Sequence, residues 1–128
     1  MQQAPILVVD DDPDALEIVG TFLESRGYRV LTAKDGKEAL ALLEEARPSL
    51  LLLDVMMPGM DGWEVSRIIK NHPEYSDTRV VMLTARGEFA DKQEGLRAGA
   101  DDYIVKPIRL QELDTKVVRN LVARERKR

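Results

Sequence analysis

The chain has 128 residues, of which 44% are hydrophobic and 33% are charged, and its net charge is −4. These values suit one globular domain, exclude a disordered chain, and provide no overall basic field for binding nucleic acid. The chain contains no cysteine, and it shows neither a signal peptide nor an apolar run of about 20 residues. We therefore expect a cytoplasmic protein without disulfides, membrane segments or direct contact with nucleic acid.

The first predicted strand ends in a run of three acids. Residues 6–9 (ILVV) form a short apolar run rich in β-branched residues, which is typical of a buried strand. Asp12 suits the N-cap of the following helix, and Pro13 suits its first turn. Capping leaves Asp10 and Asp11 as two like charges at a strand end, where a cation or a proton would relieve their repulsion.

The most apolar stretch of the chain also ends in a carboxylate. Four consecutive leucines at residues 50–53 predict a strand buried on both faces, and Asp54 follows them. Open α/β sheets bind ligands beyond the carboxyl ends of their strands, so Asp54 is a candidate functional residue. The neighbouring patterns predict a strand at residues 28–33 and helices at 37–46 and 63–71.

Strand and helix signals continue to alternate through the rest of the chain. Thr84 ends one predicted strand, and Lys106 directly follows another. A basic stretch at residues 123–128 is expected to be a tail or the start of a linker after a domain spanning 1–122. The remaining predicted elements are strands at residues 79–84 and 103–105 and helices at residues 88–98 and 110–121.

Five strand–helix repeats predict an α/β fold of the doubly wound, flavodoxin-like type. Its five-stranded sheet would be parallel, with helices on both faces. In such a (βα)5 fold every strand ends at the same edge of the sheet. Three acids, a hydroxyl and an ammonium should therefore meet there, contributed by Asp10, Asp11, Asp54, Thr84 and Lys106.

This set of side chains favours phosphoryl chemistry. Carboxylates without cysteine or histidine suit Mg²⁺, and they are too few to enclose Ca²⁺. A metal, an ammonium and a hydroxyl together can balance the oxygens of a phosphoryl group. Asp54, on the central strand, is then the expected nucleophile, and its product would be an aspartyl phosphate.

Two other classes of protein are weighed against this interpretation. A phosphohydrolase of the haloacid-dehalogenase type would carry a second Asp two residues after the nucleophile, where this chain has Met56. A flavodoxin-like cofactor module would carry a phosphate loop rich in Ser, Thr and Gly after the first strand, where this chain has three acids. A Mg²⁺-dependent gain in mass with small phosphodonors, without flavin colour, would separate the three possibilities.

Four motifs, in order and at normal spacing, resemble the receiver domain of response regulators in two-component signalling, of the CheY-like type. The resemblance covers essentially the whole chain. The matching stretches are residues 8–11 (VVDD), 53–62 (LDVMMPGMDG), 83–85 (LTA) and 98–103 (AGADDY), the last followed by Lys106 and Pro107.

The resemblance implies a role for each of these positions. Asp54 would take a phosphoryl group from a histidine kinase or a histidine phosphotransfer protein. The domain itself would catalyse this transfer and, later, the hydrolysis of the aspartyl phosphate by autodephosphorylation. Thr84 and Lys106 would bind the phosphoryl oxygens, and the Lys106–Pro107 bond would be cis. The implied Mg²⁺ ligands are Asp10, Asp11, Asp54 and the backbone carbonyl of Met56.

The resemblance also implies a switch and an output surface. Thr84 and Tyr103 would move on phosphorylation and reshape the face made by the fourth helix, the fifth strand and the fifth helix. The mixed charges of this face are either a solvated surface with weak ion pairs or the contact of a phosphorylation-dependent homodimer, which would resemble the dimer of transcription-factor receivers. Trp63 starts the helix directly after the loop of Asp54, so its fluorescence should report the change. The cross-chain pairs expected in this dimer are Lys92 with Glu112 and Asp102 with Lys116. The output domain or output partner is left open.

Overall fold

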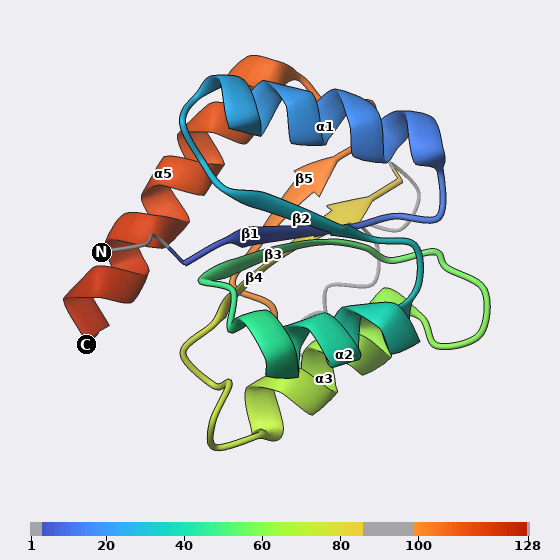
Figure 1. Ribbon diagram of the computed structural model, residues 1–128, viewed down its shortest axis with the longest axis vertical. Coiled ribbons are helices and arrows are strands. Elements are labelled where there is room, and N and C mark those ends of the chain that lie inside the picture. The colour runs from blue at the N-terminus through green and yellow to red at the C-terminus, as the bar shows by residue number, and fades with distance from the viewer. Residues whose placement is uncertain (1–3, 86–98, 128) are drawn as a thin grey trace.

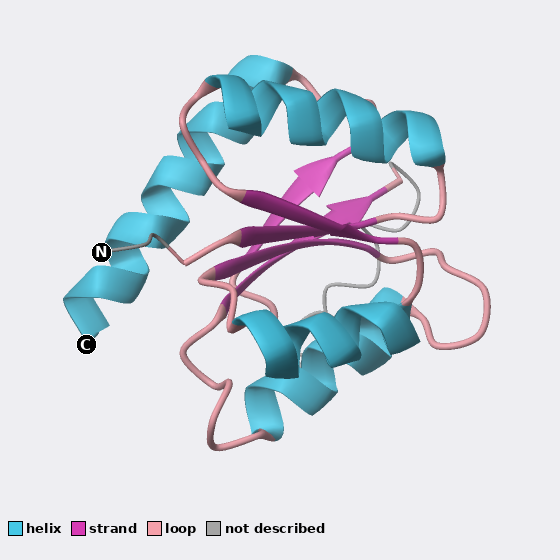
Figure 2. Ribbon diagram, viewed as in Figure 1, coloured by secondary structure: helices cyan, strands magenta, loops and turns pink. Residues whose placement is uncertain are grey.

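The computed structural model describes residues 4–85 and 99–127, and these form one five-stranded sheet flanked by helices (Figures 1 and 2). The strands are β1 (Ile6–Val9), β2 (Val30–Ala33), β3 (Leu50–Asp54), β4 (Arg79–Thr84) and β5 (Asp102–Val105). The described helices are α1 (Pro13–Ser25), α2 (Gly36–Ala46), α3 (Gly62–Asn71) and α5 (Leu110–Lys127). The helix expected at residues 88–98 lies outside the described residues.

All strand pairs in the sheet are parallel, and the strand order is β2-β1-β3-β4-β5. The chain therefore starts next to the central strand, winds outward to β2, and then crosses back to β3, β4 and β5. The reversal falls between β1 and β3, which is where sheets of this kind open a crevice for a ligand. The predicted doubly wound α/β fold is confirmed.

Helices α1 and α5 cover one face of the sheet, and α2 and α3 cover the other (Figure 1). Successive strand residues point to opposite faces, so the apolar runs supply two core layers at once. The layer under α1 and α5 contains Ile6, Val8, Leu50, Leu52, Val81, Leu83 and Ile104. The layer under α2 and α3 contains Leu7, Val9, Leu51, Leu53, Val80 and Met82.

An aspartate caps the start of each of three helices by accepting a hydrogen bond from a backbone N–H. Such a cap satisfies one of the four N–H groups that a helix start leaves free, and it stabilises a helix by about 1 kcal/mol. The expected role of Asp12 is thereby confirmed. The acceptors and donors are Asp12 with Asp14 (3.0 Å), Asp35 with Glu38 (2.8 Å) and Asp61 with Glu64 (2.9 Å).

Two predicted element bounds differ from the structure by more than one residue. Strand β2 begins at Val30 rather than at residue 28, because the N–H of Tyr28 donates to the carbonyl of Leu23 and still belongs to the end of α1. Helix α5 continues to Lys127, since residues 122–127 contain neither glycine nor proline to end it. The domain boundary expected after residue 122 stays a prediction. No helix within the described ranges is long and apolar enough to cross a membrane.

Candidate functional site

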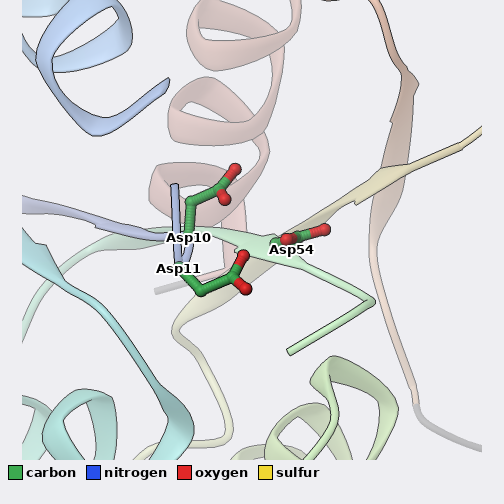
Figure 3. Close-up of side chains that lie close together, drawn as sticks. All are labelled: Asp10, Asp11 and Asp54. Atoms are coloured by element: carbon green, nitrogen blue, oxygen red, sulfur yellow. The ribbon is translucent and has the colours of Figure 1, made fainter. Parts of the chain in front are cut away.

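Three carboxylates gather where β1 and β3 end side by side (Figure 3). The register pairs Val9 with Leu53, so the residues that follow or end these strands come together. One oxygen from each of Asp10, Asp11 and Asp54 lies within 4.8 Å of the others. Asp10 and Asp54 are only 1% and 5% exposed, whereas Asp11 is exposed. The predicted acidic cluster is therefore present, with one acid open to solvent.

Backbone N–H groups orient the two buried carboxylates. Oδ1 of Asp10 accepts a hydrogen bond of 3.0 Å from the N–H of Asp12, and Oδ1 of Asp54 accepts one of 3.3 Å from the N–H of Met56. The loops after β1 and β3 thus hold the acids in place, and the polar ends of the side chains keep a partner where water is largely excluded.

Lys106 provides the only positive charge that is seen within salt-bridge distance of these acids in the described parts of the chain. Its Nζ lies 3.1 Å from Oδ2 of Asp10 and 3.2 Å from Oδ1 of Asp54. Burial by itself would lower the pKa of the Lys106 ammonium, but the Asp54 charge and the hydrogen bond to Asp10 outweigh it and raise that pKa. Lys106 is therefore protonated and positively charged between the two carboxylates.

The pKa of Asp54 is raised from 3.8 to about 6. Burial is the largest cause and the charge of Asp10 adds to it, while Lys106 and the Met56 N–H oppose them. Two buried acids held beside one ammonium leave an excess of negative charge. A divalent cation would balance this excess, and all the available donors are hard oxygens. The residues present thus fit Mg²⁺.

Thr84 brings a hydroxyl to the same edge of the sheet. It is the last residue of β4, beside the end of β3, and it is 1% exposed. Its Oγ1 is buried and has no hydrogen-bond partner in the described part of the structure. A buried hydroxyl without a partner is costly, so this atom is available to a ligand oxygen.

The structure brings together all the side chains expected at the strand edge, and it also shows the expected cis bond between Lys106 and Pro107. Met56 is 66% exposed at the mouth of the site. Tyr103 lies half-buried on β5, where burial and then the charge of Asp102 raise the pKa of its phenol.

Gly62 is the last residue of the 53–62 motif, which assigns it no role of its own, but the structure makes it part of the site. A Cβ at Gly62 would lie 2.3 Å from the carbonyl oxygen of Asp54 and 2.9 Å from Cα of Val55. Only glycine lets α3 begin this close to the strand end that carries Asp54. The signal was present in the Asp61-Gly62 pair before the helix, but the pair alone does not reveal a close approach of two backbone segments.

Comparison with known proteins identifies the class to which this fold and site belong. Residues 6–118 match the family model described as the response regulator receiver domain. The chain belongs to this family. It is thus a receiver domain of two-component signalling, a class whose general role is that of a phosphorylation switch, whose members generally bind Mg²⁺, and which interacts with histidine kinases or phosphotransfer proteins.

Several curated relatives are transcriptional regulators. The "Probable transcriptional regulator ycf27" of Porphyra purpurea is 45% identical over 116 residues, which cover 91% of this chain and 46% of that protein. The "DNA-binding response regulator MtrA" of Mycolicibacterium smegmatis is 43% identical over 112 residues, which cover 88% of this chain and 48% of that protein. The chain thus spans about half the length of the curated relatives that it matches.

Solved structures share the fold over nearly the whole chain. A putative response regulator from Chloroflexus aurantiacus superposes with a TM-score of 0.89 at 36% identity, covering 94% of this chain and 99% of that one. The chemotaxis protein CheY4 of Vibrio cholerae has a TM-score of 0.86 at 36% identity, covering 92% of this chain and 98% of that one. The predicted resemblance to receiver domains is confirmed.

Proposed function

We propose that Asp54 accepts a phosphoryl group from a phosphohistidine with the help of Mg²⁺. The observation that carries the proposal is the convergence of Lys106 and the unpartnered Oγ1 of Thr84 on the edge of the sheet where Asp54 ends β3. An ammonium and a free hydroxyl are the groups that a transferred phosphoryl group needs around it.

In the proposed reaction a carboxylate oxygen of Asp54 attacks the phosphorus atom. A P–O bond forms as the P–N bond to the donor imidazole breaks, and the electron pair of that bond leaves on the imidazole nitrogen, which then takes up a proton. Lys106 binds one phosphoryl oxygen, and Thr84 donates its hydroxyl hydrogen to another. Asp54 must be ionised to attack, which its pKa of about 6 permits at neutral pH.

The proposed metal ligands are the carboxylates of Asp10, Asp11 and Asp54 and the backbone carbonyl of Met56. Mg²⁺ favours a small number of carboxylates and retains several water molecules, which agrees with an exposed Asp11 at the rim. When bound, the ion neutralises excess charge on the acids and on the phosphoryl oxygens.

We further infer that the protein phosphodonor docks on a hollow beside the site. A hollow of about 260 Å³ lies between α1 and the chain after β5, and Lys106 is part of its wall. Its Ile18 is 60% exposed and its Leu110 is 40% exposed. A donor must approach this edge to place its phosphohistidine at Asp54, so an apolar helix face of the donor would cover these side chains. The apolar lining consists of Ala15, Ile18, Val19, Pro107, Ile108 and Leu110.

The docking proposal separates a protein donor from a small one. Ile18→Asp should slow transfer from a phosphorylated histidine phosphotransfer domain that serves the wild type, by about tenfold or more, because a charge would be buried at the contact. Phosphorylation by acetyl phosphate should stay within about twofold. The matched control is Ile68→Asp on α3, which is 40% exposed and lies on the other face of the sheet. Equal loss with both donors would contradict docking at this hollow.

The proposed switch couples phosphorylation of Asp54 to Thr84 and Tyr103, and through them to the face formed by the fourth helix, β5 and α5. The fourth helix lies outside the described residues. What supports this coupling is position: Thr84 borders the site, and the N–H of Lys106, just after β5, donates to the Thr84 carbonyl at 2.7 Å. A shift of Thr84 would therefore reach β5 directly.

The central experiment is phosphorylation with acetyl phosphate and Mg²⁺, followed by intact-mass measurement. The wild type should gain the mass of one acid-labile phosphoryl group, and Asp54→Asn should not. The matched control is Asp61→Asn, because Asp61 is an acid of the same loop that caps α3 instead. Chelation of Mg²⁺ should stop incorporation in both competent proteins. An undiminished gain in the Asp54→Asn protein would overturn the assignment.

A further inference from the structure

An aromatic contact joins the start of α3 to the middle of β5. The rings of Trp63 and Tyr103 meet edge-on, with their centroids 6.3 Å apart and their planes at 62°. Trp63 is only 8% exposed, and Tyr103 packs against the same core layer. Edge-on pairs of this kind stabilise a fold beyond the apolar area that they bury. This contact links two residues that lie 40 positions apart in the sequence.

The Trp63 end of this contact is tied tightly to the strand end that carries Asp54. The N–H of Gly62 donates to the carbonyl of Val55 at 2.9 Å. The two backbone segments are so close that a Cβ at Gly62 would lie 2.3 Å from the carbonyl oxygen of Asp54. Packed segments in such contact do not slide independently, so a displacement of residues 54–55 is passed to Gly62 and to its neighbour Trp63.

The Tyr103 end of the contact lies against charged groups of α5. Nζ of Lys116 donates to the backbone carbonyl of Tyr103 and also lies 3.5 Å from the carboxylate of Asp102. Arg119 approaches the same carboxylate at 3.6 Å. A change at Tyr103 is therefore positioned to disturb the charge pairs on the β5–α5 face.

We propose that Trp63 is a positioning residue that connects the loop after Asp54 to Tyr103. This connection differs from the one through Thr84, because it runs along the start of α3 rather than through the end of β4. It rests on the proposed phosphorylation of Asp54 and adds to it a residue that sets how strongly the site and Tyr103 are coupled. Binding of a phosphoryl group changes the Trp63–Tyr103 contact, and by linkage the contact changes the affinity for that group.

A double-mutant cycle on ligand affinity tests the proposal. The ligand is beryllofluoride with Mg²⁺, a mimic of the phosphoryl group, and the affinity is measured by isothermal titration calorimetry. Trp63→Leu should change the affinity by about threefold or more, which corresponds to the lower part of the range for coupled neighbours. In a Tyr103→Ala background the same substitution should change the affinity by less than about 1.5-fold. If the contact were equally strong in the free and the bound protein, its loss would destabilise both states equally, and the affinity would not change.

Two further variants give the cycle its controls. Trp63→Phe retains an aromatic ring at this position and should restore the affinity to within about 1.5-fold of the wild type. Phe22→Leu, on α1, removes an aromatic ring that packs against the core layer on the other face of the sheet from Tyr103, and should leave the affinity unchanged. Circular dichroism and urea denaturation confirm that each variant is folded before titration.

A second measurement keeps the proposal falsifiable if Trp63→Leu does not fold. In the otherwise native protein, the fluorescence of Trp63 should change when beryllofluoride and Mg²⁺ bind, and Tyr103→Ala should remove at least about half of that change. The proposal is overturned by a full response in Tyr103→Ala, or by an equal effect of Trp63→Leu in both backgrounds. A wild type that does not bind the mimic at all would instead refute the proposed function.

Discussion

The ammonium nitrogen of Lys106 lies 3.2 Å from Oδ1 of Asp54, so the end of β5 supplies the charge that balances the end of β3. The lysine side chain is one-third exposed, whereas the carboxylate side chain is 7% exposed. The two residues are 52 positions apart in the sequence and meet because both strands end at the same edge. Because the lysine remains accessible to solvent at the strand ends, this ion pair can interact with a ligand that binds at the site.

The first prediction is that Lys106→Met stays folded but loses phosphoryl transfer. Methionine is unbranched and similar in length to the apolar stem of lysine, so the substitution opens no cavity. Protonation of Asp54 can relieve the negative charge that Lys106 no longer balances. We expect a loss of at most about 2 kcal/mol in the free energy of unfolding at pH 7, and phosphorylation by acetyl phosphate slowed by about 100-fold. Urea denaturation and intact-mass kinetics measure the two effects. Transfer at the wild-type rate would contradict the assigned role of Lys106.

The second prediction concerns stability and pH without Mg²⁺. The pKa of Asp54 is about 6 in the folded protein and near 3.8 when unperturbed, so between these values the folded state holds a proton that the unfolded chain has lost. The contribution of Asp54 to the free energy of unfolding is therefore fully present below about pH 4. It falls as the pH rises to about 6, and at higher pH it no longer changes. Asp54→Asn should be more stable than the wild type at pH 7, by roughly 1–3 kcal/mol.

Paired urea denaturation of the wild type and the Asp54→Asn protein at several pH values measures this difference. The advantage of the variant should shrink as the pH falls from 6 to 4. Saturating Mg²⁺ should stabilise the wild type at pH 7 and reduce the advantage, because the ion replaces the missing positive charge. An advantage that is constant across this pH range would show that Asp54 does not titrate as described.

The third prediction compares two buried glycines. Gly62→Ala should destabilise the protein by more than about 2 kcal/mol and misplace Asp54, because its Cβ would overlap backbone atoms. Gly20→Ala on α1 is the matched control, since its nearest neighbour would be a methyl group of Val30 at 3.8 Å. This control should stabilise the protein by about 0.5–1 kcal/mol through helix propensity. Equal effects of the two substitutions in urea denaturation would refute the close approach at Gly62.

The fourth prediction concerns the lifetime of the phosphoryl group. Met56 is 66% exposed at the mouth of the site, and its N–H is bonded to Asp54. An apolar side chain there slows the entry of hydrolytic water, so Met56→Asn should shorten the lifetime by about threefold or more. Loss of acid-labile phosphate after removal of the donor measures the rate. Arg86 stands two residues after Thr84, as Met56 does after Asp54, so its position in the sequence also suits this mouth, but it lies outside the described residues. A rate for Met56→Asn within twofold of the wild type would contradict gating by Met56.

The fifth prediction concerns a homodimer that forms on phosphorylation. The sequence predicted that Asp102 meets Lys116 across two chains, but the structure pairs these residues within one chain at 3.5 Å. Asp102 also accepts a 3.0 Å hydrogen bond from the buried amide of Asn120. The neighbouring carboxylate of Asp101 lies 2.7 Å from the ammonium of Lys70 on α3. To form the predicted dimer, Asp102 and Lys116 would therefore have to give up their ion pair within the chain for ion pairs with the second chain.

We expect beryllofluoride and Mg²⁺ to produce dimers that salt weakens, because the contacts would be ion pairs. Analytical ultracentrifugation at about 100 µM protein, at low and at high salt, would detect even a micromolar contact. Lys116→Gln should weaken the dimer, and Lys37→Gln, on α2, is the matched control. The predicted partner of Glu112, Lys92, lies outside the described residues. A protein that stays monomeric at both salt concentrations would contradict the dimer and would indicate that this face binds a different protein.

Much of this protein follows from local patterns in its sequence. Four leucines before Asp54 can only be buried, and the aspartates before three helices cap them through neighbours two or three residues away. Such features depend on a few adjacent residues, so the order of the elements and the residues at the strand ends were predictable. The resemblance to receiver domains rested on these same strand-end motifs.

Only the tertiary structure decided which of these residues touch. The hydrogen bond from Lys106 to Asp10 joins residues 96 positions apart. It depends on the order and register of the strands, which the alternation of strands and helices in the sequence does not determine. The close approach at Gly62, the ring contact of Trp63 with Tyr103, and the internal pairing of Asp102 arise in the same way. Each of them is set by how the layers pack, because contact between distant residues is a property of the whole core and leaves no mark on the neighbouring sequence.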